Sequence, residues 1–213
     1  MTGARVTPLG DRALTVTWEG SVAVAHPLVR AAAARLEVAR LPFVQDLVPA
    51  YTTLSIFFDP LDHDYSAVSS RVLDLIQGLE PAARASGREV VIPVVYHGPD
   101  LTDVARQTGL REAEVVSRHS ARIYEVYLVG FAPGWAYLGD LDPSLVLPRR
   151  AAPRQRVPAG SVAIAGGQTG VYPFAIPGGW HLIGRTDTVM FDAARQEPAL
   201  LRVGDRVRFE SRT

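Results

Sequence analysis

The 213-residue sequence contains no cysteine. This absence excludes disulfides, thiolate nucleophiles and cysteine-ligated metal sites, and it fits a reducing compartment, so we expect a cytoplasmic protein. Lysine is absent as well, and all 22 basic residues are arginine. A Schiff-base lysine and the lysine of a P-loop nucleotide site are therefore excluded.

Long apolar runs are also missing. No stretch of about 18 or more apolar residues occurs, and the N-terminus has no apolar signal region, so we predict neither a membrane span nor a secretory signal. The 22 basic residues are balanced by 22 acidic ones, which gives zero net charge and argues against a nucleic-acid partner. A hydrophobic content of 47% is ordinary for one large or two small globular domains.

The first part of the chain alternates predicted strands and helices. Apolar residues at helical spacing predict helices over 26–40 and 65–79. Alternating or β-rich segments predict strands over 13–18, 43–48, 51–58 and 89–95. The order β-α-β-β-α-β is the split βαβ arrangement. We therefore predict an α+β protein with a ferredoxin-like domain over residues 1–96.

The second part begins with two short predicted helices, 101–107 and 111–119, and then changes character. From Arg122 onward helical periodicity is lost, and short alternating segments are separated by turn residues. Such a pattern is typical of an all-β barrel. We assign residues 97–213 to this second domain.

The stretch from Val129 to Arg185 is rich in glycine, proline, aromatic residues and arginine. Glycine and proline at this density specify loops in detail, and loops on a rigid scaffold commonly carry binding groups. Turns alone do not explain why large aromatic side chains are interleaved with arginines there. This stretch is therefore the best candidate for a binding site.

Several long motifs of this sequence resemble the KipI/allophanate hydrolase subunit 1 family. They are GFAPGWAYLG (Gly130–Gly139), PRR..PR..VPAGSV (Pro148–Val162), IAGGQTGVYP (Ile164–Pro173), PGGWHLIGRT (Pro177–Thr186) and LLRVGDRVRF (Leu200–Phe209). Similar segments occur upstream, so the resemblance covers nearly the whole chain. It implies a ferredoxin-like domain followed by a cyclophilin-like β-barrel.

The resemblance also implies a function. It suggests one component of a heteromeric, ATP-dependent 5-oxoprolinase, a cyclic-amide hydrolase that opens 5-oxo-L-proline to L-glutamate. The chain would then contribute part of a site shared with the C subunit, which is a second barrel protein. The resemblance implies that the separate A subunit uses the ATP and that this chain binds no cofactor. Since the chain has no nucleophile elbow, lysine or cysteine, we expect it to be inactive by itself.

Two alternatives remain open at this stage. The family also includes an inhibitor of a sporulation histidine kinase, which is a binding protein and not part of an enzyme. A role in urea or allophanate metabolism is weaker, because the Ser-Ser-Lys chemistry of an amidase needs a lysine that the chain lacks.

We predict two sets of site residues. The first set has catalytic roles and comprises His119, Gln168 and Arg185. The second set binds substrate and comprises Arg154, Thr169, Tyr172, Gly178, Gly179 and Trp180. Arg185 follows the GGW turn, and its planar fork suits a substrate carboxylate. It is expected to matter more than Arg150, which has an arginine beside it. His119 is a candidate acid or base, with a structural role as the alternative. No metal site is predicted.

Overall fold

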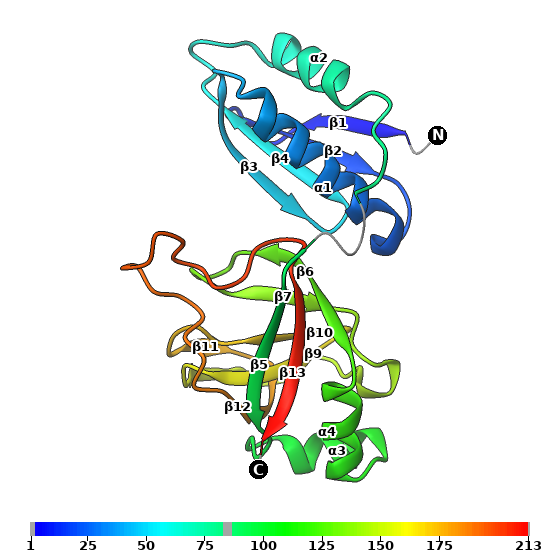
Figure 1. Ribbon diagram of the computed structural model, residues 1–213, viewed down its shortest axis with the longest axis vertical. Helices are drawn as coiled ribbons and strands as arrows, with labels where there is room; N and C mark the ends of the chain where they lie inside the picture. Colours follow the sequence, from blue (N-terminus) through cyan, green and yellow to red (C-terminus); the bar gives the residue numbers. More distant parts are fainter. Residues whose placement is uncertain (1–2, 83–86, 213) are drawn as a thin grey trace. The chain divides into compact units, whose positions relative to one another are not determined.

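A computed structural model describes residues 3–82 and 87–212. The chain forms two compact units, Met1–Ser86 and Gly87–Thr213 (Figure 1). The predicted boundary between residues 96 and 97 is wrong, because strand β5 (Glu89–Val95) belongs to the second unit. The sequence pattern locates β5 correctly but does not reveal its distant partner strand.

The first unit is a four-stranded antiparallel sheet with two helices. The strands lie in the order β1-β2-β4-β3, and they are β1 (Ala4–Pro8), β2 (Ala13–Trp18), β3 (Val44–Ala50) and β4 (Thr53–Phe58). Helices α1 (Val22–Ala39) and α2 (Tyr65–Ile76) share one apolar core with β2 and β4. Strands β2 and β4 alternate buried apolar residues with half-buried ones, mostly threonine and serine, as expected when helices cover one face of a sheet.

The chain order of this unit differs from the predicted β-α-β-β-α-β. It is β-β-α-β-β-α, because β1 precedes β2 and β5 contributes to the other unit. β1 pairs antiparallel with β2 at the edge of the sheet. Helix α1 begins at Val22, so Pro27 lies inside the helix and not in its first turn.

The second unit is a closed seven-stranded barrel, in agreement with the prediction of a β-barrel. Its strand order is β10-β7-β6-β13-β5-β12-β9. Besides β5, these strands are β6 (Ile123–Val129), β7 (Ala136–Gly139), β9 (Ser161–Ala165), β10 (Gln168–Val171), β12 (His181–Arg185) and β13 (Arg206–Arg212). The interior is filled by apolar side chains from all of them. That the barrel is of the cyclophilin-like type stays a prediction.

The barrel closes through its first and last strands. β5 and β13 pair in parallel over their full lengths, from Glu89 beside Arg206 to Val95 beside Arg212. At the start of this pair, Arg88 donates to the Asp205 carboxylate, with 2.7 Å between Nη2 and Oδ2. Pairs this distant in sequence are invisible to local pattern analysis.

Two helices, a short 3-10 helix and a two-stranded ribbon lie against the barrel. Helices α3 (Leu101–Thr108) and α4 (Glu112–Ser120) follow β5. Asp100 is the N-cap residue of α3. A short 3-10 helix, η2 (Pro143–Leu145), follows β7. β8 (Arg154–Val157) and β11 (Ile176–Gly178) form a separate two-stranded ribbon. Within the described ranges, no helix is long and apolar enough to cross a membrane.

Candidate functional site: an aromatic hollow on the barrel

Aromatic residues and an arginine surround a small hollow of about 80 Å³ in the second unit. Its lining residues come from four of the glycine- and proline-rich motifs, and they are Phe131, Trp135, Tyr137, Arg149, Tyr172, Gly178, Gly179 and Trp180. The structure thus brings together four of the six residues predicted to bind substrate, namely Tyr172, Gly178, Gly179 and Trp180. Among the described residues, no acidic side chain lines the hollow.

Trp135 forms the centre of this site. Its ring is buried, and it meets Tyr172 and Trp180 edge to face, with ring centroids 4.7 and 5.1 Å apart. Phe131 contacts the same ring from the preceding loop at 6.0 Å and is 69% exposed. The φ angle of Phe131 is +75°, a left-handed conformation that is strained for a bulky residue. The loop therefore holds an aromatic ring in solvent at the rim of the hollow.

A buried carboxylate holds the arginine loop in place. Asp100 is 3% exposed, and its carboxylate accepts hydrogen bonds from both Nη atoms of Arg154, at 2.7 and 2.9 Å. The same carboxylate accepts a hydrogen bond from Arg150 Nη1 at 2.8 Å and one from the backbone N–H of Leu182 at 2.7 Å. The backbone N–H of Arg150 donates to the Gly179 carbonyl, again at 2.8 Å. Asp100 therefore links the start of α3, the arginine loop and strand β12.

The ionisation of Asp100 follows from these contacts. Burial alone would raise the pKa of its carboxyl, but the bidentate Arg154, the Leu182 N–H and the charge of Arg150 outweigh burial and lower the pKa. The carboxylate is therefore charged at neutral pH. It neutralises only one of the two guanidinium groups that contact it.

These contacts change the interpretation of two arginines. The sequence predicts that Arg154 binds substrate, but its guanidinium is already paired in a fork with Asp100. Arg150 is expected from the sequence to be a replaceable loop residue, yet it also pairs with Asp100. Arg149, between Pro148 and Arg150, is exposed, lines the hollow and has no ion-pair partner in the described part of the chain. Arg149 is thus the arginine that remains available to a ligand.

Arg185 does not lie at the hollow. Trp180 directly precedes β12 and Arg185 is its last residue, so the extended strand separates them by roughly 16 Å at about 3.3 Å per residue. The residue next to Arg185 across the sheet is Val95 on one side and Ser161 on the other. The predicted proximity of Arg185 to the GGW turn is therefore wrong, because the residues between them form strand β12, with an irregularity between Leu182 and Gly184, and not a turn.

His119 is part of a buried hydrogen-bond chain. Its Nδ1 lies 2.7 Å from the Tyr96 hydroxyl, and its Nε2 lies 2.8 Å from Thr169 Oγ1. Thr169 donates its hydroxyl proton to the Ala163 carbonyl at 3.0 Å, so it can only accept from His119. This pattern assigns the proton to Nε2 and makes Tyr96 a donor to Nδ1.

The surroundings of His119 favour its structural role. The side chain is fully buried, and its ring packs 4.7 Å from that of Phe209. Burial lowers the pKa of His119 to about 3, so the imidazole is neutral at physiological pH. Neither His119 nor Thr169 lines the hollow. Gln168 begins β10 after the Gly166-Gly167 turn of the β9–β10 hairpin and does not line the hollow either.

Comparison with known proteins places these features in a family. Residues 4–201 match the family described as the carboxyltransferase domain, subdomains C and D. The chain is 43% identical to the 5-oxoprolinase B subunit of Escherichia coli O157:H7 over 98% of this chain and 96% of that protein. It is 36% identical to the protein of the same name in Bacillus subtilis strain 168, over 96% and 91%. The chain belongs to the family of the 5-oxoprolinase B subunit.

Solved structures also share this fold, and some of them are of longer chains. TTHA0988 superposes with a TM-score of 0.84 and 40% identity over 95% of this chain, which spans 40% of the length of that solved chain. PH0987 from Pyrococcus horikoshii superposes at 0.58 with 37% identity over 97% of both chains. The Kluyveromyces lactis urea carboxylase is 18% identical with a TM-score of 0.77, over all of this chain and 22% of the other, and it shows the shared fold alone.

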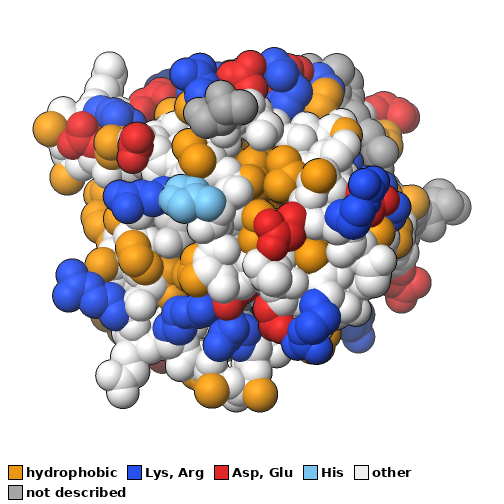
Figure 2. Space-filling model, turned by 90° about the horizontal axis from the view of Figure 1, so that it is seen from below, with side chains coloured by type: hydrophobic (Ala, Val, Ile, Leu, Met, Phe, Trp, Pro, Cys, Tyr) orange, Lys and Arg blue, Asp and Glu red, His pale blue; other side chains and the backbone are white. Residues whose placement is uncertain are grey.

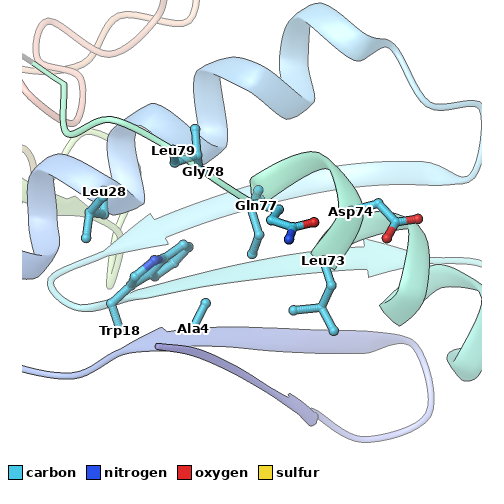
Figure 3. Close-up of a pocket in the computed structure, with 9 residues that line it drawn as sticks. Ala4, Trp18, Leu28, Leu73, Asp74, Gln77, Gly78 and Leu79 are labelled. Atoms are coloured by element: carbon cyan, nitrogen blue, oxygen red, sulfur yellow. The ribbon is translucent and has the colours of Figure 1, made fainter. Parts of the chain in front are cut away.

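The first unit contains a different hollow, of about 420 Å³, between the sheet and the two helices (Figure 3). Apolar side chains such as Trp18, Leu28 and Leu73 line it, and its polar side chains are Asp74 and Gln77. It contains no predicted site residue and none of the motifs that identify the family. Among residues 3–82 and 87–212, no group of three or more acidic or histidine side chains is arranged to hold a metal ion. The aromatic hollow therefore remains the candidate site.

Two adjacent glycines of the hollow allow a matched test. A Cβ on Gly178 would lie 2.0 Å from the Tyr172 hydroxyl oxygen, whereas a Cβ on Gly179 would meet nothing closer than Pro153 at 3.5 Å. We expect Gly178→Ala to displace Tyr172 and to lower the free energy of unfolding by about 2 kcal/mol. Gly179→Ala should change it by less than about 0.5 kcal/mol. Thermal melting measures both, and equal melting temperatures would contradict the close contact.

Proposed function

We propose that the chain is the B subunit of an ATP-dependent 5-oxoprolinase, which hydrolyses 5-oxo-L-proline to L-glutamate together with its A and C subunits. The observation that carries this proposal is the full-length identity of 36–43% to bacterial proteins named as the B subunit of 5-oxoprolinase. In this reaction water adds across the lactam C–N bond, the carbonyl carbon gains the hydroxyl and the nitrogen becomes the amine of glutamate. ATP hydrolysis by the complex accompanies this step.

The side chains support a contributing role and not a complete catalyst. The hollow offers aromatic walls and the guanidinium of Arg149, which are binding groups. The imidazole of His119 is inaccessible, and Ser161 is buried in β9 and lies outside any nucleophile elbow. The groups that activate the lactam and deliver the water therefore come at least in part from the other subunits.

The test is reconstitution. We expect the purified chain alone to release no glutamate from 5-oxoproline, with or without ATP, because the hollow supplies binding groups and not a nucleophile or base. Addition of the cognate A and C subunits should produce ATP-dependent glutamate formation. Turnover by the isolated chain, or an inactive mixture in which all three proteins are folded, would each contradict the proposal.

A further inference from the structure

We infer that the aromatic hollow is a subsite for the carboxylate of a small cyclic amide, and that Arg149 makes the charge-assisted contact to it. The inference rests on the proposed function for the identity of the ligand, but its chemistry follows from the residues of the hollow. It assigns to Arg149 the role that the sequence pattern suggests for Arg185.

The charges around the hollow favour an anion. Arg149, Arg150 and Arg154 bring three guanidinium groups to this loop, and Asp100 is the carboxylate that contacts the latter two. Asp100 is saturated by Arg154, Arg150 and the Leu182 N–H. The loop therefore has a net positive charge, and the guanidinium of Arg149 places positive charge at the hollow. Figure 2 shows one face of the molecule, on which arginines and acidic side chains are intermixed.

The walls of the hollow add a second argument. Burial raises the pKa of the Tyr172 hydroxyl, and the positive charges of Arg149 and Arg154 act on this pKa in the opposite direction. Both charges therefore lie close enough to the phenol to influence its ionisation. Trp135 is buried, and its Nε1–H has no acceptor within the described ranges. The site thus combines donors and positive charge with flat apolar walls. Such a subsite suits the carboxylate of a small ring ligand.

Asp100 acts as a positioning residue in this arrangement. It fixes the side chains of Arg150 and Arg154, and the backbone of Arg150 is bonded to Gly179 in the wall of the hollow. The backbone next to Arg149 is therefore constrained, whereas its own guanidinium pairs with no carboxylate of the residues that the structure describes. A preorganised loop of this kind loses less entropy when it binds a ligand.

The experiment compares two ligands and four proteins. The ligands are 5-oxo-L-proline and 2-pyrrolidone, which has the same lactam ring without the carboxylate. The proteins are the wild type, Arg149→Ala, Arg149→Lys and Arg156→Ala, and Arg156 is an exposed arginine of the same segment outside the hollow. Binding to the full chain is followed by tryptophan fluorescence, since Trp135 and Trp180 line the hollow, and KM is measured in the complex with the A and C subunits.

We expect Arg149→Ala to weaken binding of 5-oxoproline, or to raise its KM, about tenfold or more, which corresponds to the loss of one hydrogen-bonded charge contact. Arg149→Lys should retain part of the affinity, and Arg156→Ala should stay within about twofold of wild type. Wild-type affinity for 2-pyrrolidone should be lower and independent of Arg149. Unchanged binding by Arg149→Ala, equal loss in Arg156→Ala, or equal affinity for both ligands would overturn the inference.

The two proposals fail in different ways. If the complex hydrolyses 5-oxoproline with the same KM in the wild type and in Arg149→Ala, the subsite is wrong while the proposed function stands. If the complex is inactive but the chain alone binds 5-oxoproline through Arg149, the subsite stands and the proposed function falls. Absence of 5-oxoproline binding in both the chain and the complex overturns the subsite.

Discussion

Replacement of Asp100 by alanine is expected to lower the free energy of unfolding of the barrel unit by about 3 kcal/mol and its melting temperature by about 10 °C. The change leaves the side chains of Arg150 and Arg154 without their counter-ion and the buried Leu182 N–H without an acceptor. This value lies at the low end for a broken buried ion pair, since the side chains of Arg150 and Arg154 are 30% and 26% exposed.

The control for this variant lies on the same helix. Asp103 is in the first turn of α3 and forms an exposed pair with Arg106, so Asp103→Ala should leave the melting temperature almost unchanged. Asp100→Asn should lie between the two, because the amide oxygen can still accept from the backbone. Thermal and urea unfolding measure all three. Similar losses for Asp100→Ala and Asp103→Ala would show that the buried cluster contributes no special stability.

Acidification should begin to destabilise the barrel through His119 at a pH above the range in which carboxylates titrate. The folded chain keeps this imidazole neutral down to a pKa of about 3, whereas the unfolded chain protonates it near pH 6.5. Stability contributed by neutral His119 is therefore complete above about pH 6.5. Below that pH it decreases by up to about 1.4 kcal/mol per unit, until the folded pKa is reached.

The comparison that isolates this effect uses two glutamine variants. In His119→Gln the free energy of unfolding should be lower at pH 7, because packing and hydrogen bonds are lost, but its dependence on pH between about 6 and 4 should be weaker than in the wild type. The exposed His97 serves as the control, and His97→Gln should retain the wild-type slope. Identical slopes for all three proteins would show that His119 is not buried in its neutral form. The activity of the complex should show no ionisation of His119 near neutral pH.

The sequence predicts the residues of the hollow better than it predicts their neighbours. Tyr172, Gly178, Gly179 and Trp180 belong to Gly- and Pro-rich loops, and such a local composition is visible in the sequence. Arg154 is different, because its role depends on Asp100, which lies 54 residues earlier in the chain. An aspartate directly before a helix resembles an ordinary N-cap, yet Asp100 makes no side-chain cap and turns toward β12 instead. No local signal distinguishes these two uses of the residue.

Two other errors have the same physical origin. The sequence pattern suggests that GRT is a turn beside GGW, but pairing with β9 and β5 keeps residues 181–185 extended and moves Arg185 away. The pattern also assigns strand β5 to the first domain because its predicted position follows α2, although its partners are β12 and β13. Periodicity predicts that a segment is a strand, but the choice of partner depends on packing across the whole unit.

The parallel pairing of β5 with β13 has a consequence for synthesis of the protein on the ribosome. Arg88 and Asp205 are 117 residues apart, so at about 5–20 residues per second β5 emerges on the order of ten seconds before its main partner. During this interval its valine-rich edge has no β13 to pair with and could recruit strands of other chains. Pro93, in the middle of β5, lacks an N–H donor. It therefore interrupts the hydrogen-bonding edge of the nascent strand and limits aggregation until the C-terminal strand closes the barrel.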